Sequence, residues 1–138
     1  MMHMTKITVR GYHVDMYQHV NNARYLEFLE EARWDLFEGH VDLERWKTLG
    51  LAFFVANLSI NYRRPASLGD VLEIATGLSR FGHKSATFSQ RIVLKGTDTL
   101  VADADITFVL ADMKTGRAVP IEGELRALFE PFCLDPSC

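Results

Sequence analysis

Hydrophobic residues recur at helical spacing in the N-terminal half of the chain. Between Asn22 and Glu38 the apolar positions follow one another every three or four residues, and charged residues occupy positions between them. This pattern predicts an amphipathic helix of roughly 25 Å, at about 1.5 Å per residue. Asn21 or Asn22 is expected to cap its start, and Gly39 to take the left-handed conformation just past its end. The apolar stripe consists of Tyr25, Leu29, Ala32 and Leu36.

After Gly50 the pattern changes to alternation, which is typical of β-strands. Glycine, proline and polar turn residues separate the alternating segments, so the connections are short. Short connections favour antiparallel neighbours, because a parallel pair needs a crossover of a dozen residues or more. The predicted strands are Phe54 to Arg64, Val71 to Phe81, His83 to Leu94 and Leu100 to Ala111, with a short last one from Arg117 to Pro120.

Only the region from Asn22 to Gly50 is long enough to supply a crossover, so the fold class is predicted to be α+β. A single domain spanning residues 1–138 is expected, in which one antiparallel sheet of five or six strands covers a long helix. Three shorter elements complete it: a first strand through Ile7, Val9 and Gly11, a helix from Asp42 to Leu49 ended by Gly50 and carrying Trp46 on its apolar side, and a closing helix from Glu122 to Phe132.

The composition narrows the classes of function. The formal net charge is -3 and the basic residues are dispersed, so no nucleic-acid partner is expected. No apolar stretch approaches the ~20 residues that cross a bilayer, and the N-terminus lacks a signal-peptide pattern, so no membrane insertion is expected. Cys133 and Cys138 lie at the end of the chain, which favours reduced thiols over a disulfide framework. We therefore predict a cytoplasmic protein.

Reactive side chains are densest in the turn from Tyr12 to Asn22. Asp15 precedes the predicted helix by a short loop, and the free amides at a helix N-terminus can hold an oxyanion. A thioester needs only such a carboxylate and such donors, because its thiolate leaves readily. The alternative is that Asp15 merely caps the loop or the helix. His13, Asp15 and His19 can also be drawn as a metal trio, but no second ligand cluster supports it, so neither a metal nor another cofactor is expected.

Several motifs resemble one known family. The run from His19 to Arg33, preceded by Asp15, is similar to the signature of the 4-hydroxybenzoyl-CoA thioesterase branch of the hotdog superfamily. The likeness continues through Asn61 to Ala66, Gly69-Asp70 and Lys84-Ser85, and is strongest to the bacterial long-chain acyl-CoA thioesterase III type. Two positions depart from the pattern. Gln18 stands where many relatives have glycine, and Asn22 where some have histidine.

The resemblance implies a helix wrapped by an antiparallel sheet, and homodimers or homotetramers with active sites at the interface between subunits. Asp15 falls on the family's catalytic aspartate, as nucleophile or general base, with His19 and Asn22 beside it. Because Asn22 replaces a histidine found in some relatives, a histidine-assisted step at that position is not expected.

Contacts to the substrate are expected at the end of one predicted strand, at Tyr62 to Arg64, and at the start of the next but one, at Lys84-Ser85. Arginine and lysine at these places can meet the phosphates of CoA, although a solvated sheet edge is an equally good interpretation for each residue alone. Five phenylalanines, Phe53, Phe54, Phe81, Phe88 and Phe108, are expected in the core, and a few of them can line an acyl tunnel. The expected substrate-binding residues are Tyr17, Tyr25, Tyr62, Arg63, Arg64, Lys84 and Ser85.

The predicted function is hydrolysis of medium- to long-chain fatty acyl-CoA. The alternative is a non-catalytic acyl-CoA sensor or binding protein with the same pocket. Asp15 discriminates between them, because a binding protein has no use for a costly carboxylate facing the thioester. A dehydratase acting on acyl-carrier protein would need a His/Glu pair, to which the sequence offers no good match.

Overall fold

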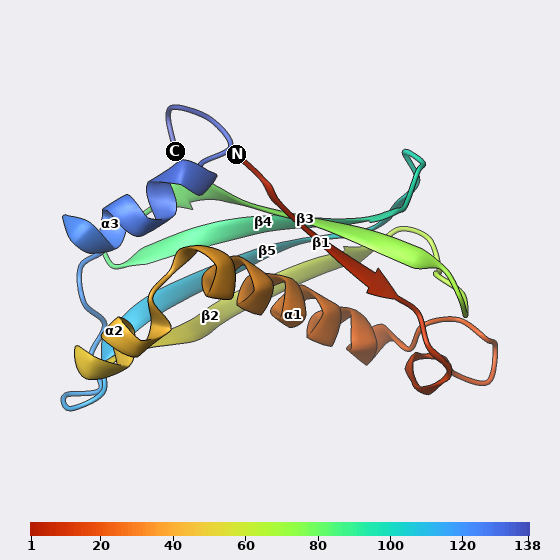
Figure 1. Cartoon of the computed structure of the whole chain (residues 1–138), viewed down its shortest axis with the longest axis horizontal. Coiled ribbons are helices and arrows are strands. Elements are labelled where there is room, and N and C mark those ends of the chain that lie inside the picture. Colours follow the sequence, from red (N-terminus) through yellow and green to blue (C-terminus); the bar gives the residue numbers. More distant parts are fainter.

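One five-stranded antiparallel sheet forms the body of the molecule, and helix α1 lies across one of its faces (Figure 1). The computed structural model describes residues 1–138 without a gap. The strands stand in the order β1-β3-β4-β5-β2, so β1 and β2 are the edges. The predicted helix wrapped by an antiparallel sheet is thereby confirmed. The strands are β1 (His3–Thr8), β2 (Leu51–Tyr62), β3 (Val71–Phe81), β4 (Ser85–Leu94) and β5 (Leu100–Asp112).

Two strand predictions need correction at their ends. The first strand was predicted through Gly11, but β1 ends at Thr8, and Gly11–His13 forms a 3-10 turn instead. The short strand predicted from Arg117 to Pro120 is reduced to a single bridge between Ala111 and Ala118. Both segments keep backbone hydrogen bonds to a neighbour, Val9 with Asp70 and Gly69, and Val119 with Leu110, but this pairing is too short to extend a ladder.

Helix α1 (Asn22–His40) buries the stripe predicted from its spacing: Leu29, Ala32 and Leu36 are fully buried. Asn21 caps it, since the side-chain oxygen accepts a hydrogen bond from the Ala23 amide at 3.0 Å. The expected end at Gly39 is wrong, because Gly39 lies inside the helix.

Helix α1 continues past Gly39 because the residues on both sides of it pack into the core. Phe37 and Val41 are both buried, and the Val41 amide donates to the Phe37 carbonyl at 2.8 Å. The extended Val41, rather than a left-handed glycine, is the residue that ends the helix.

Two short helices close one end of the sheet. α2 (Leu43–Thr48) buries Trp46, and α3 (Glu124–Phe129) continues into a 3-10 turn at Glu130–Phe132. Phe129 is fully buried, with its ring centroid 5.2 Å from that of Phe108 in the sheet. Gly50 follows α2 with a φ of 70°, as its predicted role at the end of that helix requires. None of the helices is both long enough and apolar enough to pass through a bilayer.

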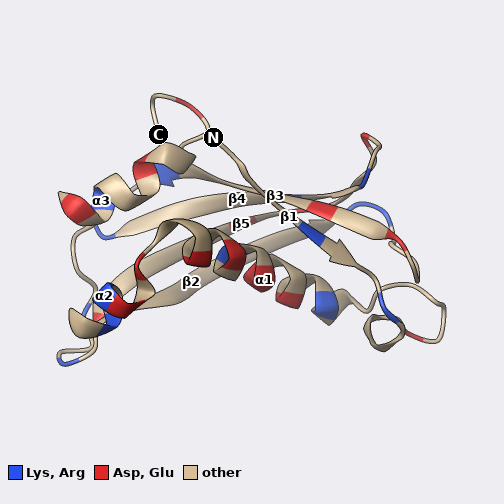
Figure 2. Ribbon diagram, in the orientation of Figure 1, with Lys and Arg blue, Asp and Glu red and all other residues tan.

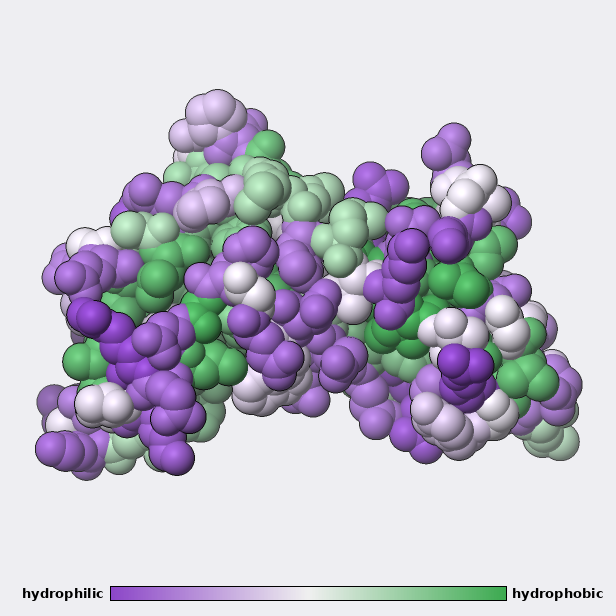
Figure 3. Space-filling view, in the orientation of Figure 1, coloured by the Kyte–Doolittle hydropathy of each residue, from purple (hydrophilic) through white to green (hydrophobic).

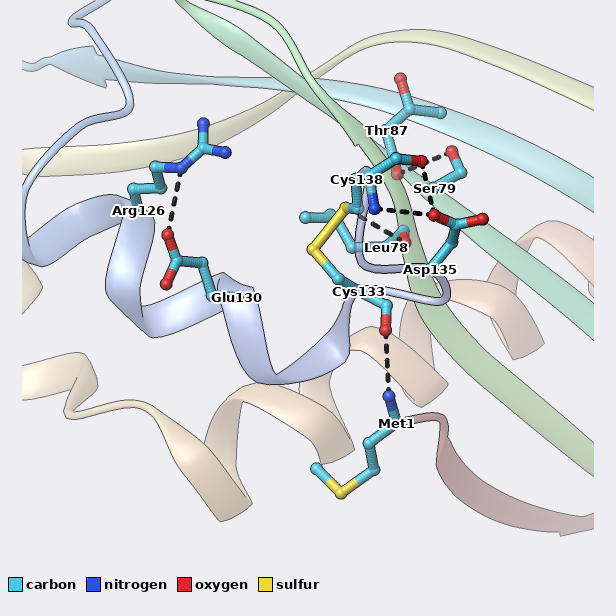
Figure 4. The surroundings of a disulfide bond; sticks show 10 residues. Met1, Leu78, Ser79, Thr87, Arg126, Glu130, Cys133, Asp135 and Cys138 are labelled. Atoms are coloured by element: carbon cyan, nitrogen blue, oxygen red, sulfur yellow. Dashed lines mark hydrogen bonds and ion pairs between the residues drawn. A yellow bond between two sulfur atoms is a disulfide. The ribbon is translucent and has the colours of Figure 1, made fainter.

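Cys133 and Cys138 form a disulfide, which corrects the expectation that both are reduced (Figure 4). The chain turns back after the 3-10 turn and places their Cα atoms 5.6 Å apart. The Leu134 amide donates to the Leu78 carbonyl of β3 at 2.9 Å and holds this turn on the sheet. The cysteine argument for a reducing compartment therefore loses its basis, and the cytoplasmic location stays a prediction.

Candidate active site

The loop between β1 and α1 folds back on itself as a tight hairpin. Val14 bridges Val20, and the Asp15 amide donates to the His19 carbonyl at 2.9 Å. The Gln18 amide closes the turn on the Asp15 carbonyl at 3.0 Å. Gln18 is the only non-glycine residue of the chain with a positive φ, at 62°. The position where many relatives have glycine is therefore one whose backbone conformation suits glycine.

The Asp15 carboxylate is held by one oxygen only. Its Oδ1 accepts a hydrogen bond from the Tyr17 amide at 2.9 Å, and Oδ2 has no partner in the chain. The local bond fixes the carboxylate, while the second oxygen stays free to meet a reacting atom.

The start of α1 lies against the same hairpin. The Asn21 amide donates to the His13 carbonyl and the Val20 amide to the Ala66 carbonyl, both at 2.9 Å. The Asn22 amide, the first of the helix, donates to no group of the chain. A free N-H at the positive end of a helix is a suitable donor to a developing oxyanion.

A pocket of about 260 Å³ brings most of the predicted catalytic and binding residues together. It contains the predicted catalytic residues Asp15, His19 and Asn22, and it opens between the start of α1 and the end of β2. Its lining consists of Asp15, His19, Val20, Asn22, Tyr25, Tyr62, Arg63, Arg64 and Pro65.

Two tyrosines fix the walls of this pocket. The buried Tyr25 hydroxyl accepts from the Ala66 amide at 3.0 Å, and burial raises the pKa of Tyr25. The Tyr62 hydroxyl donates to the Asn22 carbonyl at 3.1 Å. The end of β2 is thus tied directly to the start of α1, beside the free Asn22 amide.

The two arginines of the pocket differ in their bonding. Arg63 Nε lies 2.8 Å from Asp103 Oδ2, and this bond, together with one from Asn61, lowers the pKa of Asp103. Arg64 makes no ion pair with any carboxylate. Arg64 is therefore the cation that remains available to an anionic ligand at the mouth of the pocket.

Three predicted binding residues lie elsewhere in the chain. Tyr17 is 72% exposed and does not line the pocket, although its amide holds Asp15. Lys84 and Ser85 lie at the opposite end of the sheet, since Ser85 is level with Phe54 across β5. That level is roughly 26 Å along β2 from Tyr62, at about 3.3 Å per residue.

The three residues of the alternative metal trio, His13, Asp15 and His19, do not form a metal-ligand cluster. The His13 ring accepts from the Arg10 amide at 2.8 Å and packs edge-on against Phe28, with centroids 4.8 Å apart. Burial, followed by the charge of Arg24, lowers the pKa of His13. His13 is thus occupied outside the pocket that contains Asp15 and His19.

The position of a larger cavity, of about 570 Å³, was not predicted from the sequence, although a tunnel lined by a few phenylalanines was expected. It lies between the second half of α1, α2 and the start of β2, and most of its lining is hydrophobic. Phe53 and Phe54, two of the expected tunnel residues, line it, whereas Phe81, Phe88 and Phe108 do not. Arg33 also lines it. Its spacing carried a signal, because Arg33 lies four residues after Leu29 and three before Leu36, next to the buried stripe.

Comparison with known proteins gives the family of this fold and site. Residues 9–129 match the family model described as the Thioesterase-like superfamily. The chain is 56% identical over 127 residues to the long-chain acyl-CoA thioesterase FadM of Escherichia coli K12, covering 91% of this chain and 96% of the relative. It is 33% identical to the acyl-CoA thioester hydrolase YbgC of E. coli O6:H1, over 67% of this chain and 69% of that protein.

The comparison with solved structures indicates the same family. The crystal structure of the probable thioesterase YbaW from E. coli superposes with a TM-score of 0.87 at 53% sequence identity, covering 94% of this chain and 97% of that one. The resemblance stated from the motifs is confirmed: the chain belongs to the thioesterase-like superfamily.

Proposed function

We propose that this protein hydrolyses the thioester of medium- to long-chain fatty acyl-CoA, releasing a fatty acid and CoA. One observation carries the proposal: a carboxylate with one free oxygen, Asp15, shares a pocket with the unbonded amide of Asn22 at the start of α1. A nucleophilic or basic oxygen and an oxyanion donor are what acyl transfer from a thioester requires.

The thioester carbonyl would lie with its oxygen on the Asn22 amide and its carbon facing Asp15. In one route, the carboxylate attacks this carbon, the CoA thiolate leaves, and water then hydrolyses the resulting anhydride. In the other, Asp15 takes a proton from water, whose oxygen attacks the carbonyl carbon directly. Both routes end with a carboxylic acid and a thiol. His19 lines the same pocket, and its ring makes no hydrogen bond within the chain, so it is available to the leaving group or to the water.

Two features support acyl-CoA as the substrate. A relative that is 56% identical over nearly its whole length is named a long-chain acyl-CoA thioesterase. Arg64 lines the pocket without an ion pair, as a contact to the CoA phosphates requires. We assign Tyr25, Tyr62 and Arg63 to the walls of the substrate site, and Tyr17 to positioning Asp15 through its amide.

We further propose a homodimer, or a homotetramer built from such dimers, with the site completed at the interface. Strand β2 is an edge of the sheet and exposes Phe54 (48%) and Val55 (44%). Antiparallel pairing with a second β2 would reverse the strand, so that the partner's Phe54 end, level with its Ser85, approaches Tyr62. Lys84 and Ser85 would then contact a substrate bound in the other subunit.

The test is thiol release from palmitoyl-CoA by the Asp15→Asn protein, with Asp98→Asn, in an exposed turn, as the matched control. We expect Asp15→Asn to lower kcat by about a hundredfold or more and to leave substrate binding intact, while Asp98→Asn matches the wild type. Turnover within a few fold of wild type would refute the role of Asp15. Binding without turnover in the wild-type protein would instead favour the non-catalytic acyl-CoA binding protein.

A further inference from the structure

The hairpin that carries Asp15 has little buried surface to hold it in place. Within residues 10–19 only His13, Val14 and Asp15 are partly buried, and the others are exposed. Figure 3 shows hydrophobic and hydrophilic side chains mixed on the surface at the end of the molecule where Figure 1 places this hairpin. Because burial contributes little here, the position of Asp15 depends on hydrogen bonds and on the few side chains that contact the core.

His13 contacts three parts of the chain around the Asp15 pocket. Its Nδ1 accepts a hydrogen bond from the Arg10 amide at 2.8 Å, and its own amide donates to the Arg10 carbonyl at 3.0 Å. Its ring packs edge-on against the buried Phe28 of α1, with centroids 4.8 Å apart. Its carbonyl accepts from the Asn21 amide at 2.9 Å. His13 therefore joins the segment that leaves β1, the buried face of α1 and the residue that caps this helix.

The bond from Asn21 to His13 leads directly to the groups proposed for the reaction. Asn21 caps α1 and immediately precedes Asn22, whose amide is the proposed oxyanion donor. Across the same hairpin, the Asp15 amide donates to the His19 carbonyl at 2.9 Å. The two bonds together set the register of one side of the hairpin against the other. They therefore also set the position of Asp15 relative to the Asn22 amide.

The bond from Arg10 requires a neutral His13 ring. A neutral imidazole has one N-H, so Nδ1 accepts a hydrogen bond only while the proton is on Nε2. In the imidazolium both nitrogens are donors, and an Nδ1 proton would face the Arg10 amide. Protonation of His13 therefore breaks this contact.

The surroundings of His13 favour the neutral ring. Burial is the main cause that lowers the pKa of His13; Arg24 and then Arg10 lower it further, while Glu27 opposes them. Arg24 and Glu27 are paired at 2.7 Å, and Figure 2 shows the basic start of α1 followed by acidic segments. The other titratable side chain in contact is Tyr12, with its ring centroid 4.2 Å from that of His13.

We propose that His13 is a positioning residue for thioester hydrolysis: its neutral ring anchors the hairpin so that the Asp15 carboxylate and the Asn22 amide face the same carbonyl. His13 lies outside the pocket that both groups line, so it acts through them and not on the substrate. The inference rests on the proposed function, because it concerns the same site. Loss of the Nδ1 acceptor would loosen the hairpin, and a small displacement of reacting groups is costly to the rate.

Two variants separate the acceptor from the charge of the ring. His13→Asn supplies an amide oxygen as acceptor and does not titrate, whereas His13→Phe keeps a ring against Phe28 but has no acceptor. At pH 8 we expect His13→Asn to keep kcat for palmitoyl-CoA within about threefold of the wild type. His13→Phe should lower kcat by about tenfold or more and change KM little. His40→Asn, an exposed histidine at the other end of α1, is the matched control and should match the wild type.

The pH dependence is a readout that a merely structural role would not change. Because the fold lowers the pKa of His13, its protonation lies below pH 6.5, the ordinary value for histidine. Wild-type kcat should fall as the pH drops through the pKa of His13, which NMR of the imidazole nitrogens measures, and His13→Asn should lack this step. The amide resonances of Asn21 and Asn22 should shift with the same pKa in the wild type. The NMR titration of the wild type needs no variant, so it decides even if His13→Phe fails to fold.

Three results would each overturn the inference: wild-type kcat in His13→Phe, identical pH profiles of the wild type and His13→Asn, or Asn21 and Asn22 amides that do not respond to His13. The proposed function fails in a different way. Full turnover by Asp15→Asn would overturn it, together with the role of His13 in that reaction. Hydrolysis that depends on Asp15 but not on His13 would overturn the inference alone.

Discussion

Gln18 holds a backbone conformation that L-amino acids rarely adopt, at the turn that positions Asp15. Its φ is 62°, and its amide closes the turn on the Asp15 carbonyl. A side chain in the left-handed region costs roughly 1 kcal/mol relative to the ordinary regions. The hairpin that presents Asp15 therefore carries local strain, which the bridges from Val14 to Val20 and from His19 to Ser67 hold in place.

Replacing Gln18 with glycine should relieve this strain. We expect Gln18→Gly to raise the free energy of unfolding by roughly 0.5 kcal/mol, the relief of strain being partly offset by the greater freedom of glycine in the unfolded chain. Urea denaturation measures the change. Gln18→Ala is the control, since alanine keeps the Cβ and should give no gain. A loss of stability in the glycine variant would show that the Gln18 side chain contributes more than its conformation costs.

Helix α1 lines both cavities: its first turn lines the Asp15 pocket, and its second half lines the larger cavity of about 570 Å³. The continuity of the helix through Gly39 determines where its second half ends against α2. Gly39 has no positive φ, and a Cβ built on it meets no atom within 4 Å. Gly50, in contrast, has a φ of 70°.

The two glycines should therefore respond in opposite directions to alanine. Gly39→Ala is expected to stabilise the protein by about 0.5 to 1 kcal/mol, because alanine is the better residue in a helix interior. Gly50→Ala is expected to destabilise it by about 1 kcal/mol, because its backbone is left-handed. Thermal or urea unfolding of both variants gives the comparison. Destabilisation by Gly39→Ala would mean that the helix ends at Gly39 after all.

Predictions that depend on local spacing were more reliable than those that depend on contacts between residues far apart in the sequence. The α1 stripe and the strand Val71–Phe81 come from local periodicity and are confirmed, since each element buries the face that its spacing predicts. The end of α1 depends instead on the packing of Phe37 and Val41. The preference for glycine just past the end of a helix takes no account of such packing. Alternation likewise continues past the last ladder partner in β1, so its boundary needed the tertiary structure.

The candidate site was predictable where its residues are close in sequence. Asp15, His19 and Asn22 share one short segment, and the structure brings them into one pocket. Lys84 and Ser85 came from the family resemblance, and the single chain places them at the far end of the sheet. The position of the larger cavity was not predicted because the cavity depends on α1, α2 and β2 meeting in space, and because Arg33 was not recognised among the buried positions.

At the scale of the whole molecule, the unpaired edge of β2 is the feature that supports pairing with a second subunit. An exposed edge strand with apolar side chains is a template for pairing with another strand. In the proposed dimer the two sheets would join through β2, and the Asp15 pocket of each subunit would be completed by the other.

A charge on this edge should separate the subunits. We expect the wild-type protein to sediment as a dimer or tetramer at micromolar concentration, and Val55→Lys to shift it to the monomer, because a charged lysine would replace an apolar side chain at the edge that the partner covers. Lys95→Val, remote from β2 in the β4–β5 turn, is a suitable surface control. A wild-type protein that is monomeric at this concentration contradicts the proposed assembly.

The two ends of the chain meet on the molecule, and this has a practical consequence. The Met1 amino group donates to the Cys133 carbonyl at 3.1 Å, next to the disulfide-closed turn on β3 (Figure 4). In Figure 1 both termini lie together, away from the hairpin that carries Asp15. A short peptide linker can therefore join the old ends, and new ends can be opened in an exposed turn such as Gly96–Asp98. A second domain fused at either of the present ends should leave the Asp15 pocket unobstructed.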